Sequence, residues 1–391
     1  MLAGLAEAGP PAEADAASLS AIAGNSDLTG SFSGQNDIAS RVATTQLDNF
    51  GNRLSELRGD TCQRISVDLS LTQNQAEHDA WDTLITSGDA PPRGANPTLQ
   101  SKDSATDRAL CGGWETHAWA NGHVTFGSLA EDTPRLGFDY VATGISSGFD
   151  LRQSADLSVG GGVGLDTDET VVGSNGTRIG ASAVSVAGYA SYHPKESSFV
   201  EGLAGIGALQ LDNARAASEG DGTEYGHRNG GVAFGQVSVG LEQRVGDATL
   251  QPYGRLAVDA IHLRPYSEAG DAEALNFSSQ SQVSLRSSIG LKARYLATRL
   301  ADWFSVSPWA EVEAGRDRTF SSDGAISLIA DPAANHHRIT DPSTGNRRLS
   351  VGIGTDITFG KSFDVALSYR GTFETSDGTS QQLALTSKLP F

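Results

Sequence analysis

The sequence has 391 residues, with 28 Lys and Arg against 47 Asp and Glu, and therefore a formal net charge of −19. This acidic balance excludes nucleic acid as a partner, because binding to phosphate groups needs a basic surface. Transmembrane helices are also excluded. The longest uncharged stretches, such as 179–194, are diluted by Gly, Ser and Ala and cannot supply the roughly 20 apolar positions that a spanning helix needs.

The first 35 residues are acidic, rich in Ala, Gly and Ser, and without a clear period. The first basic residue is Arg41, so the positively charged start of a secretory signal peptide is missing. The chain is therefore either a cytosolic protein or an internal piece of a longer precursor. We expect 1–35 to be a flexible linker or the remaining end of a segment that has been removed.

An apolar stripe at helical spacing follows in 36–58 and predicts one helix. The stripe consists of Ile38, Val42, Leu47, Phe50, Leu54 and Leu57. Ser33 or Asn36 is expected to cap the start of this helix, and Gly59 to end it. At 1.5 Å per residue the helix would be about 35 Å long, comparable with the ~30 Å hydrocarbon layer of a membrane.

The next segment, 59–112, is polar, contains a Pro-Pro pair and holds both cysteines, Cys62 and Cys111. We predict an irregular connection here. The two cysteines are compatible with one disulfide in an oxidising compartment or with two free thiols. Because the chain has neither metal-ligand spacing nor a Cys-x-x-Cys motif, we expect no metal and no cofactor.

From residue 113 onward the hydrophobic period changes to two, which predicts strands with one apolar and one polar face. Segment 283–295 shows the pattern, with Ile289 on the apolar face and Arg286 on the polar face. Counting such segments gives twelve strands. Their approximate spans are 114–124, 136–152, 156–166, 178–192, 198–211, 228–244, 248–263, 280–296, 303–317, 347–359, 362–373 and 380–391.

The connections between these strands alternate in length. Brief connections are expected at 153–155, 193–197, 246–247, 296–303 and 360–361, and longer, mostly acidic ones at 166–177, 212–227, 264–280, 317–347 and 374–380. An even strand count, short turns at one end and long loops at the other are typical of an outer-membrane barrel. In hydrocarbon a sheet can span only by closing on itself, because every backbone polar group needs a partner. We therefore predict that 113–391 is an all-β membrane barrel of twelve antiparallel strands.

The polar faces of the strands carry charges of both signs, which are expected to line the lumen as ordinary channel lining. These residues are Arg255, Asp259, Arg286, Arg294, Glu311, Glu313 and Asp364. A twelve-stranded barrel encloses a wider pore than an eight-stranded one, which its own side chains fill. We expect the 36–58 helix to occupy this pore, and a surface or oligomer helix is the alternative.

Four segments carry the motifs of a known family. Segment 250–256 reads LQPYGRL, 306–312 repeats its proline-aromatic form as VSPWAEV, 284–291 reads SLRSSIGL, and 46–54 reads QLDNFGNRL ahead of the barrel. Together with the strand count, they resemble the C-terminal translocator domain of autotransporters, the type V secretion proteins of Gram-negative outer membranes. The chain also ends with Leu385, Leu389 and Phe391 on one face, which is similar to the terminal signal that the family's β-barrel assembly machinery reads.

The resemblance implies a function in protein transport. It implies a barrel in the outer membrane that carries its own N-terminal passenger, placed before Met1, to the cell surface and keeps the helix in its pore. The implied partners are outer-membrane lipid, the assembly machinery, periplasmic chaperones and the passenger. Some family members cut themselves at an Asn-Asn pair in the helix. Asn36-Asp37 and Asp48-Asn49 do not match that pair, so no cleavage site is expected.

Two other functions remain as alternatives. One is a barrel enzyme of the phospholipase or omptin type, for which the candidate residues are His117, His262, His336, His337 and Ser26. Such an enzyme needs a base held against a nucleophile or a water, and the sequence shows no such pair at convincing spacing, so no catalytic residue is expected. The other is a passive porin. The acidic run 166–169 lacks EF-hand spacing, so we expect it to be solvated rather than to bind Ca²⁺.

Overall fold

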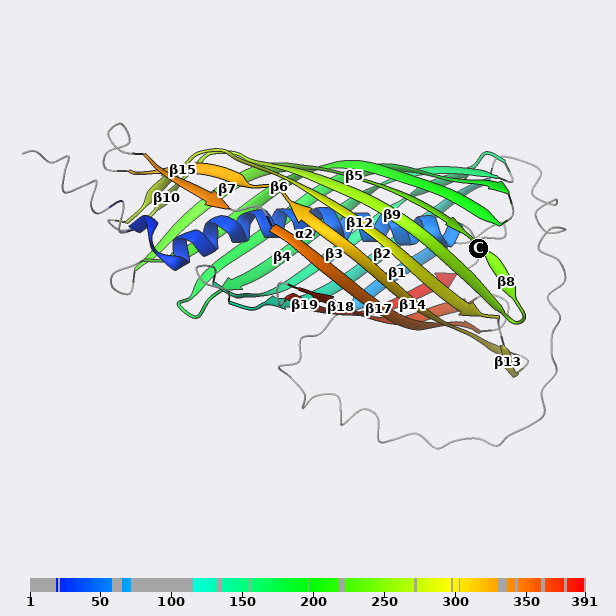
Figure 1. Cartoon of the computed structure of the whole chain (residues 1–391). Coiled ribbons are helices and arrows are strands. Elements are labelled where there is room, and N and C mark those ends of the chain that lie inside the picture. Colours follow the sequence, from blue (N-terminus) through cyan, green and yellow to red (C-terminus); the bar gives the residue numbers. More distant parts are fainter. Residues whose placement is uncertain are drawn as a thin grey trace, which may run out of the picture.

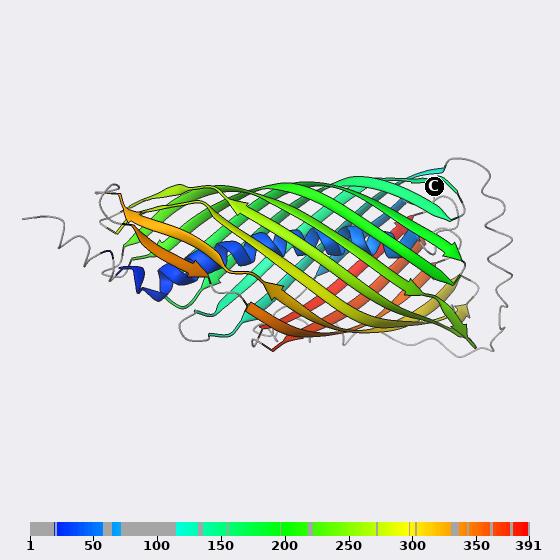
Figure 2. The same cartoon turned by 45° about the horizontal axis from the view of Figure 1, so that its top comes forward.

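A long cylinder of antiparallel strands encloses one helix in the computed structural model of the chain (Figures 1 and 2). The structure describes residues 19, 22–57, 65–71, 115–131, 136–154, 156–195, 197–217, 222–270, 273–296, 298–301, 303–329, 336–341, 344–359, 363–375 and 378–389. Cys62, Cys111 and Phe391 lie outside these residues, as do the disulfide prediction and the last residue of the predicted terminal signal.

Twelve long strands form the wall, which confirms the predicted strand count and barrel. They are β2 (Glu115–Leu129), β3 (Phe138–Arg152), β4 (Leu157–Val172), β5 (Thr177–Lys195), β6 (Ser198–Ala216), β7 (Thr223–Leu241), β9 (Ala248–Leu263), β12 (Gln280–Tyr295), β14 (Phe304–Thr319), β17 (Thr344–Phe359), β18 (Phe363–Glu374) and β19 (Gly378–Leu389). Each wall strand pairs antiparallel with the next one in this order. We call the end with the longer connections the outer end and the opposite end the inner end.

The first and last wall strands close the cylinder in two ways. At the outer end, 378–381 of β19 pair directly with 126–129 of β2. Toward the inner end a further strand, β1 (Ile65–Leu71), lies between them, antiparallel to β19 and parallel to β2. The predicted irregular connection 59–112 therefore contributes a strand to the wall. The sequence of β1, ISVDLSL, alternates apolar and polar residues, which is the signal that could have predicted it.

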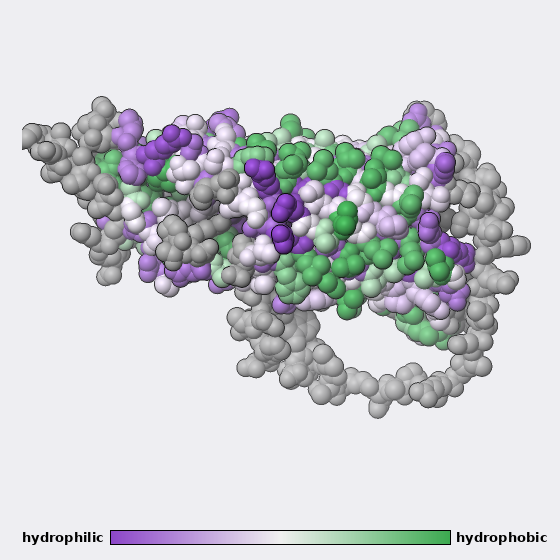
Figure 3. Space-filling view, viewed as in Figure 1, coloured by the Kyte–Doolittle hydropathy of each residue, from purple (hydrophilic) through white to green (hydrophobic). Residues whose placement is uncertain are grey.

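Apolar side chains cover the outside of the cylinder. Exposed examples from different strands are Ile145, Leu165, Val184, Ile206, Val237, Leu256, Ile289 and Ile353. Figure 3 shows apolar residues concentrated between the two ends of the visible face, whereas hydrophilic residues lie mostly at both ends. The wall strands have 12 to 19 residues, more than the 9–11 that a tilted strand needs to cross a bilayer. We call these outward apolar side chains the lipid belt, because they form the surface that faces lipid. The strands are long enough to continue beyond it.

An arginine on this belt should destabilise the barrel. Ile289 on β12 is 72% exposed and surrounded by other outward apolar residues. We expect Ile289→Arg to lower the free energy of unfolding in lipid vesicles by about 2–4 kcal/mol, the cost of Arg near the bilayer midplane. Tyr225→Arg is the matched control, because Tyr225 is also exposed but lies near the outer end of β7, where the cost falls to about 0–1 kcal/mol. Equal losses in the two variants would contradict this placement of the belt.

The two longest outer connections are folded rather than irregular. They contain β10 (Tyr266–Ala269), β11 (Leu275–Phe277), β15 (Ser322–Leu328) and β16 (His337–Asp341), which pair in this order, and β10 also pairs with β7. We call these four strands the outer cap. At the inner end two short strands, β8 (Gln243–Val245) and β13 (Thr298–Ala301), extend the hairpins below the wall.

Another predicted loop, 166–177, is mostly strand. β4 continues to Val172, so Asp166 and Asp168 lie in the wall and not in a loop. The strand extends past its predicted end because the apolar alternation stops before the hydrogen-bonded ladder does. Beyond the lipid belt a strand is wet on its outer side, and the requirement for apolar residues on that face disappears.

Helix α2 (Ser26–Leu57) runs through the cylinder, as the fold prediction required, but it begins at Ser26 rather than at Asn36. The side chain of Asn25 caps it by accepting a hydrogen bond from the backbone N–H of Asp27 at 2.7 Å, so the predicted capping by Ser33 or Asn36 is wrong. Gly30 lies against the wall where a Cβ would be 2.8 Å from Val172. No helix within the described residues has the length and apolarity to cross a membrane.

Candidate functional site: the helix-filled lumen

The predicted apolar stripe of α2 lies inside the barrel. Ile38, Val42, Leu47, Phe50, Leu54 and Leu57 are each at most 4% exposed. Phe50 packs edge-on against Trp119 of β2, with ring centroids 5.4 Å apart, and its centroid is 5.9 Å from that of Tyr189 on β5. The rest of the stripe joins one core with inward residues of β5, β6, β7 and β9, among them Ile179, Leu203, Leu209, Leu211, Val232, Phe234 and Ile261. On this side the lumen is a packed protein interior.

Polar side chains attach the middle of α2 to β4. The Arg41 guanidinium donates to both carboxylate oxygens of Asp168, at 2.9 and 3.1 Å, and to the Thr170 hydroxyl at 2.6 Å. One and a half turns further along, the Gln46 amide donates to both oxygens of Asp166, at 2.9 and 2.8 Å. Bidentate contacts of this kind fix direction as well as position, so they set the register of the helix in the pore.

A third contact attaches the inner end of α2 to β3. The Arg53 Nε donates to Asp150 at 2.7 Å, and both side chains are buried. The Tyr189 hydroxyl donates to the other oxygen of the same carboxylate. This is a desolvated ion pair, and removal of either partner would leave an uncompensated charge in the interior.

Asn49 of α2 forms a separate hydrogen-bonded group with the wall. Its side-chain amide donates to Ser146 at 2.8 Å, and its side-chain oxygen lies 2.6 Å from Nδ1 of His123. Because an amide oxygen can only accept, Nδ1 of His123 carries the proton. Asn121 donates to the backbone carbonyl of Asn49 at 3.2 Å, and Ser146 donates to the Gln46 side chain at 2.9 Å. The group holds β2, β3 and the helix at one level.

The structure pairs most of the predicted lumen charges with one another or with further wall residues. Arg286 donates to Asp259 at 2.6 Å, and Arg255 donates to Glu313 at 3.1 Å. Arg348 also reaches Glu313, at 3.3 Å. These pairs connect β9, β12, β14 and β17, so opposite charges on neighbouring strands balance inside the barrel.

The remaining predicted charges lie nearer the inner end. Arg370 donates to Glu311 at 2.9 Å, and Arg294 forms an ion pair with Asp356 at 2.5 Å. The side chain of Asp364, which is on β18, lies outside the described residues. Arg370 was placed on the polar face of its predicted strand together with Asp364, whereas Arg348 and Asp356 were not predicted, although both lie on the polar face of the strand predicted at 347–359.

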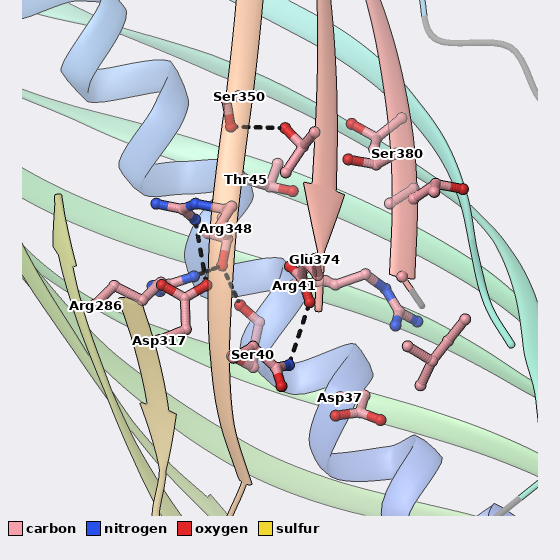
Figure 4. A pocket seen from close by; sticks show the side chains of 18 of the residues that line it. Asp37, Ser40, Arg41, Thr45, Arg286, Asp317, Arg348, Ser350, Glu374 and Ser380 are labelled. Atoms are coloured by element: carbon pink, nitrogen blue, oxygen red, sulfur yellow. Dashed lines mark hydrogen bonds and ion pairs between the residues drawn. The ribbon is translucent and has the colours of Figure 1, made fainter. Parts of the chain in front are cut away.

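A polar cavity of about 310 Å³ runs beside the helix, opposite its packed face. Side chains of α2 line one side, including Asp37, Ser40 and Arg41, and the wall from β9 through β19 to β2 lines most of the rest. Figure 4 shows these helix side chains opposite Arg348 and Glu374 across the space. The helix thus fills the lumen unevenly, with apolar packing on one side and a polar, charge-balanced space on the other.

The family model for the autotransporter beta-domain matches residues 118–370. The chain belongs to this family. The structure is similar to the translocator domain of the autotransporter NalP from Neisseria meningitidis, with 16% identity, a TM-score of 0.55, and coverage of 73% of this chain and 92% of that one. It is also similar to the beta domain of the Bordetella autotransporter BrkA, with 15% identity, a TM-score of 0.53, and coverage of 70% and 98%. A search of curated protein sequences found no match.

In this autotransporter beta-domain the wall partners of the helix were not among the predicted site residues. Asp150, Asp166 and Asp168 all lie on the inward faces of β3 and β4, and Arg41 and Arg53 lie on α2. A signal was present, since acidic residues alternate along β4 and the basic residues lie off the apolar stripe. To pair each Arg of α2 with its Asp on the wall, one needs the depth and rotation of the helix in the barrel, and these cannot be derived from the sequence.

The other predicted positions are more scattered. Leu385 and Leu389 lie in β19, opposite Leu69 and Ile65 of β1. Of the candidate catalytic residues, Ser26 begins α2 and His262 is exposed, with Nδ1 2.9 Å from the Ser281 hydroxyl. In the part of the chain that the structure describes, no carboxylate hydrogen-bonds to His262.

Proposed function

We propose that this barrel exports a passenger attached N-terminally to α2, and that α2 is the last segment to enter and then closes the pore. The direction of the helix in the pore is the main support for this proposal. Near its N-terminus, Asp27 accepts hydrogen bonds at the outer end from Thr177 and Asn175, at 2.7 and 2.8 Å. At its C-terminus, the carbonyl of Leu57 accepts one from Arg152 near an inner turn, at 3.4 Å. The N-terminal end of α2 therefore lies at the outer end of the barrel, the end from which an attached passenger would extend.

The polar side of the lumen, along the cavity, supports passage of a chain because its charges are balanced. An unfolded segment keeps water around its backbone in such a space, whereas an apolar pore would impose the cost of unpaired polar groups. The contacts of Arg41, Gln46 and Arg53 with wall aspartates can form only when α2 has reached its final position. We propose that passenger folding outside, rather than nucleotide hydrolysis, drives the outward movement.

We also propose the partners that the sequence suggested. The outward apolar belt supports contact with outer-membrane lipid, and β19, which carries Leu385 and Leu389, is the proposed recognition strand for the assembly machinery. Periplasmic chaperones would hold the unfolded strands before insertion, because exposed strand edges aggregate. The passenger is expected at the cell surface.

Fusion of a reporter domain ahead of Met1, with a signal peptide, tests export. In Gram-negative cells the reporter should become accessible to externally added protease, while the barrel shows heat-modifiable migration on gels. The matched control lacks 378–391, because this deletion removes β19 and prevents closure of the cylinder. A folded barrel whose reporter stays in the periplasm would contradict the proposal.

The His262–Ser281 pair is the one specific observation that favours a barrel enzyme. A serine nucleophile also needs donors for the oxyanion and a group that orients the histidine. The pair lies on the outward face, away from the lumen that α2 occupies, and we propose that it has no catalytic role. We propose that the lumen charges line the channel and have no specific binding role. Deletion of α2 tests the porin alternative.

A further inference from the structure

The first turns of α2 leave the lumen and enter a second hydrophobic core. Leu28 and Phe32 of the helix, together with the preceding Leu19 and Ile22, are buried among Tyr266, Leu275, Phe277, Ile326 and Ile339. All of these partners belong to the outer cap. This core is separate from the one around Phe50, so the helix has two independent attachments.

Polar contacts hold the same turns. The Arg228 guanidinium, fully buried, donates from one nitrogen to the side-chain oxygens of Gln35 and Gln280, at 2.6 and 2.9 Å. The Gln35 amide donates to the Tyr266 hydroxyl at 3.2 Å. Asn36, next along the helix, donates to Asp341 of β16 at 3.1 Å. Buried polar groups that are satisfied in only one arrangement specify that arrangement.

The cap fits the helix closely and is itself braced. A Cβ on Gly324 of β15 would lie 2.8 Å from the Phe32 ring, so only glycine leaves room for that ring. Below it, Tyr266 and Phe277 stack with centroids 4.6 Å apart. Arg215 makes a bidentate ion pair with Glu268 of β10, at 3.0 and 2.7 Å, with both side chains fully buried. The space in the outer cap that holds the Phe32 ring, which we call the socket, is fixed by these contacts and therefore favours one position of the helix.

We propose that the outer cap is a latch that binds Leu19 and residues 22–36 and keeps the pore closed after α2 has arrived. This inference rests on the proposed closure of the pore by α2. The lumen contacts of Arg41, Gln46 and Arg53 set the register of α2, and the outer cap adds a second, independent attachment at the outer end of the helix. A shift by one turn, about 5.4 Å, would withdraw Phe32 from the socket and separate Gln35 from Arg228. The latch can form only when residues 22–36 have reached the outer end of the barrel.

Single-channel recording in KCl on the purified full chain tests the latch. Phe32→Ala empties the socket and Gly324→Val fills it from the cap side, without touching the helix. We expect each to raise the probability of the large-conductance state by at least about tenfold, since the loss of a buried aromatic contact shifts an equilibrium by more than that factor. The control is Arg338→Ala, which lies on β16 but is exposed and pairs with Asp323, away from the helix. It should behave like the wild type.

The outcomes separate the latch from the closure on which it rests. If deletion of 1–57 opens the pore but Phe32→Ala and Gly324→Val stay within about twofold of the wild type, the latch is wrong and closure by α2 stands. If that deletion does not change conductance, closure itself is wrong, and the latch fails with it. Only heat-modifiable protein is recorded. Gln35→Ala, which leaves both cores intact, supplies a third variant that should open more often.

Discussion

Deletion of residues 1–57 is expected to turn the barrel into an open pore. An α-helix with its side chains is about 10–12 Å wide, and in this barrel α2 occupies the lumen from the outer to the inner end. Its removal leaves a charge-lined channel that water fills. In planar bilayers we expect a severalfold rise in conductance over the full chain. Cells that carry the deleted barrel should also become sensitive to hydrophilic antibiotics that the outer membrane excludes.

The matched control removes only 1–18, which precede the first described residue of the chain. This shorter deletion keeps α2 and the segment that enters the outer cap, and its conductance should match that of the full chain. Equal conductance with and without 1–57 would favour a passive porin with an N-terminal arm of no consequence. The deletion thus decides between the proposed function and its nearest alternative.

Asp150→Ala should be the most destabilising single substitution in the lumen. It leaves the Arg53 guanidinium buried without its carboxylate, and breaking a buried ion pair costs about 3–5 kcal/mol. The Tyr189 hydroxyl loses its acceptor at the same time. We expect this loss in the free energy of unfolding in urea and detergent, followed by tryptophan fluorescence, to which Trp119 in the same core contributes.

A double variant separates the charge effect from packing. Replacing both partners, Arg53→Met with Asp150→Leu, should recover most of the lost stability, because an apolar pair of similar volume often matches a buried ion pair. Asp323→Ala breaks an exposed pair with Arg338 and should not change the unfolding curve measurably. If the double variant is no more stable than Asp150→Ala, the unpaired Arg53 charge is not the cause of the destabilisation.

The wall of the barrel was largely predictable because lipid imposes a strict pattern. Strands such as β9, predicted at 248–263 and found at Ala248–Leu263, need an apolar residue at every second position inside the bilayer. The same rule failed outside the bilayer. β6 continues to Ala216 although its predicted end was residue 211, since its last residues are wet on the outer face and buried against the cap or helix on the other.

The start of α2 could not be predicted from helix-forming preference. Residues 26–35 contain two glycines and three serines, which are weak helix formers. The helix continues through them because Leu28 and Phe32 find a core in the cap, and because Gly30 allows close approach to Val172. Tertiary contacts from residues far away in the chain thus override the local preference.

The contents of the lumen were predictable by type but not by partner. The apolar stripe around Phe50 indicated a buried helix face, and charges such as Arg286 and Asp259 were placed on the inward side of strands that turned out to be neighbours. The aspartates that hold Arg41 and Arg53 were missed because their assignment depends on the depth and rotation of the helix. Both quantities arise from the complete barrel.

The position of β1 makes closure of the inner part of the barrel depend on a contact between distant parts of the chain. Ile65 pairs with Leu389, so the inner part of the wall joins a segment made before any wall strand to the strand made last. Contacts this distant along a chain carry a large loop-closure cost and form late in folding. A chain that lacks β19 would therefore leave two unmatched strand edges at once, one on β1 and one on β18.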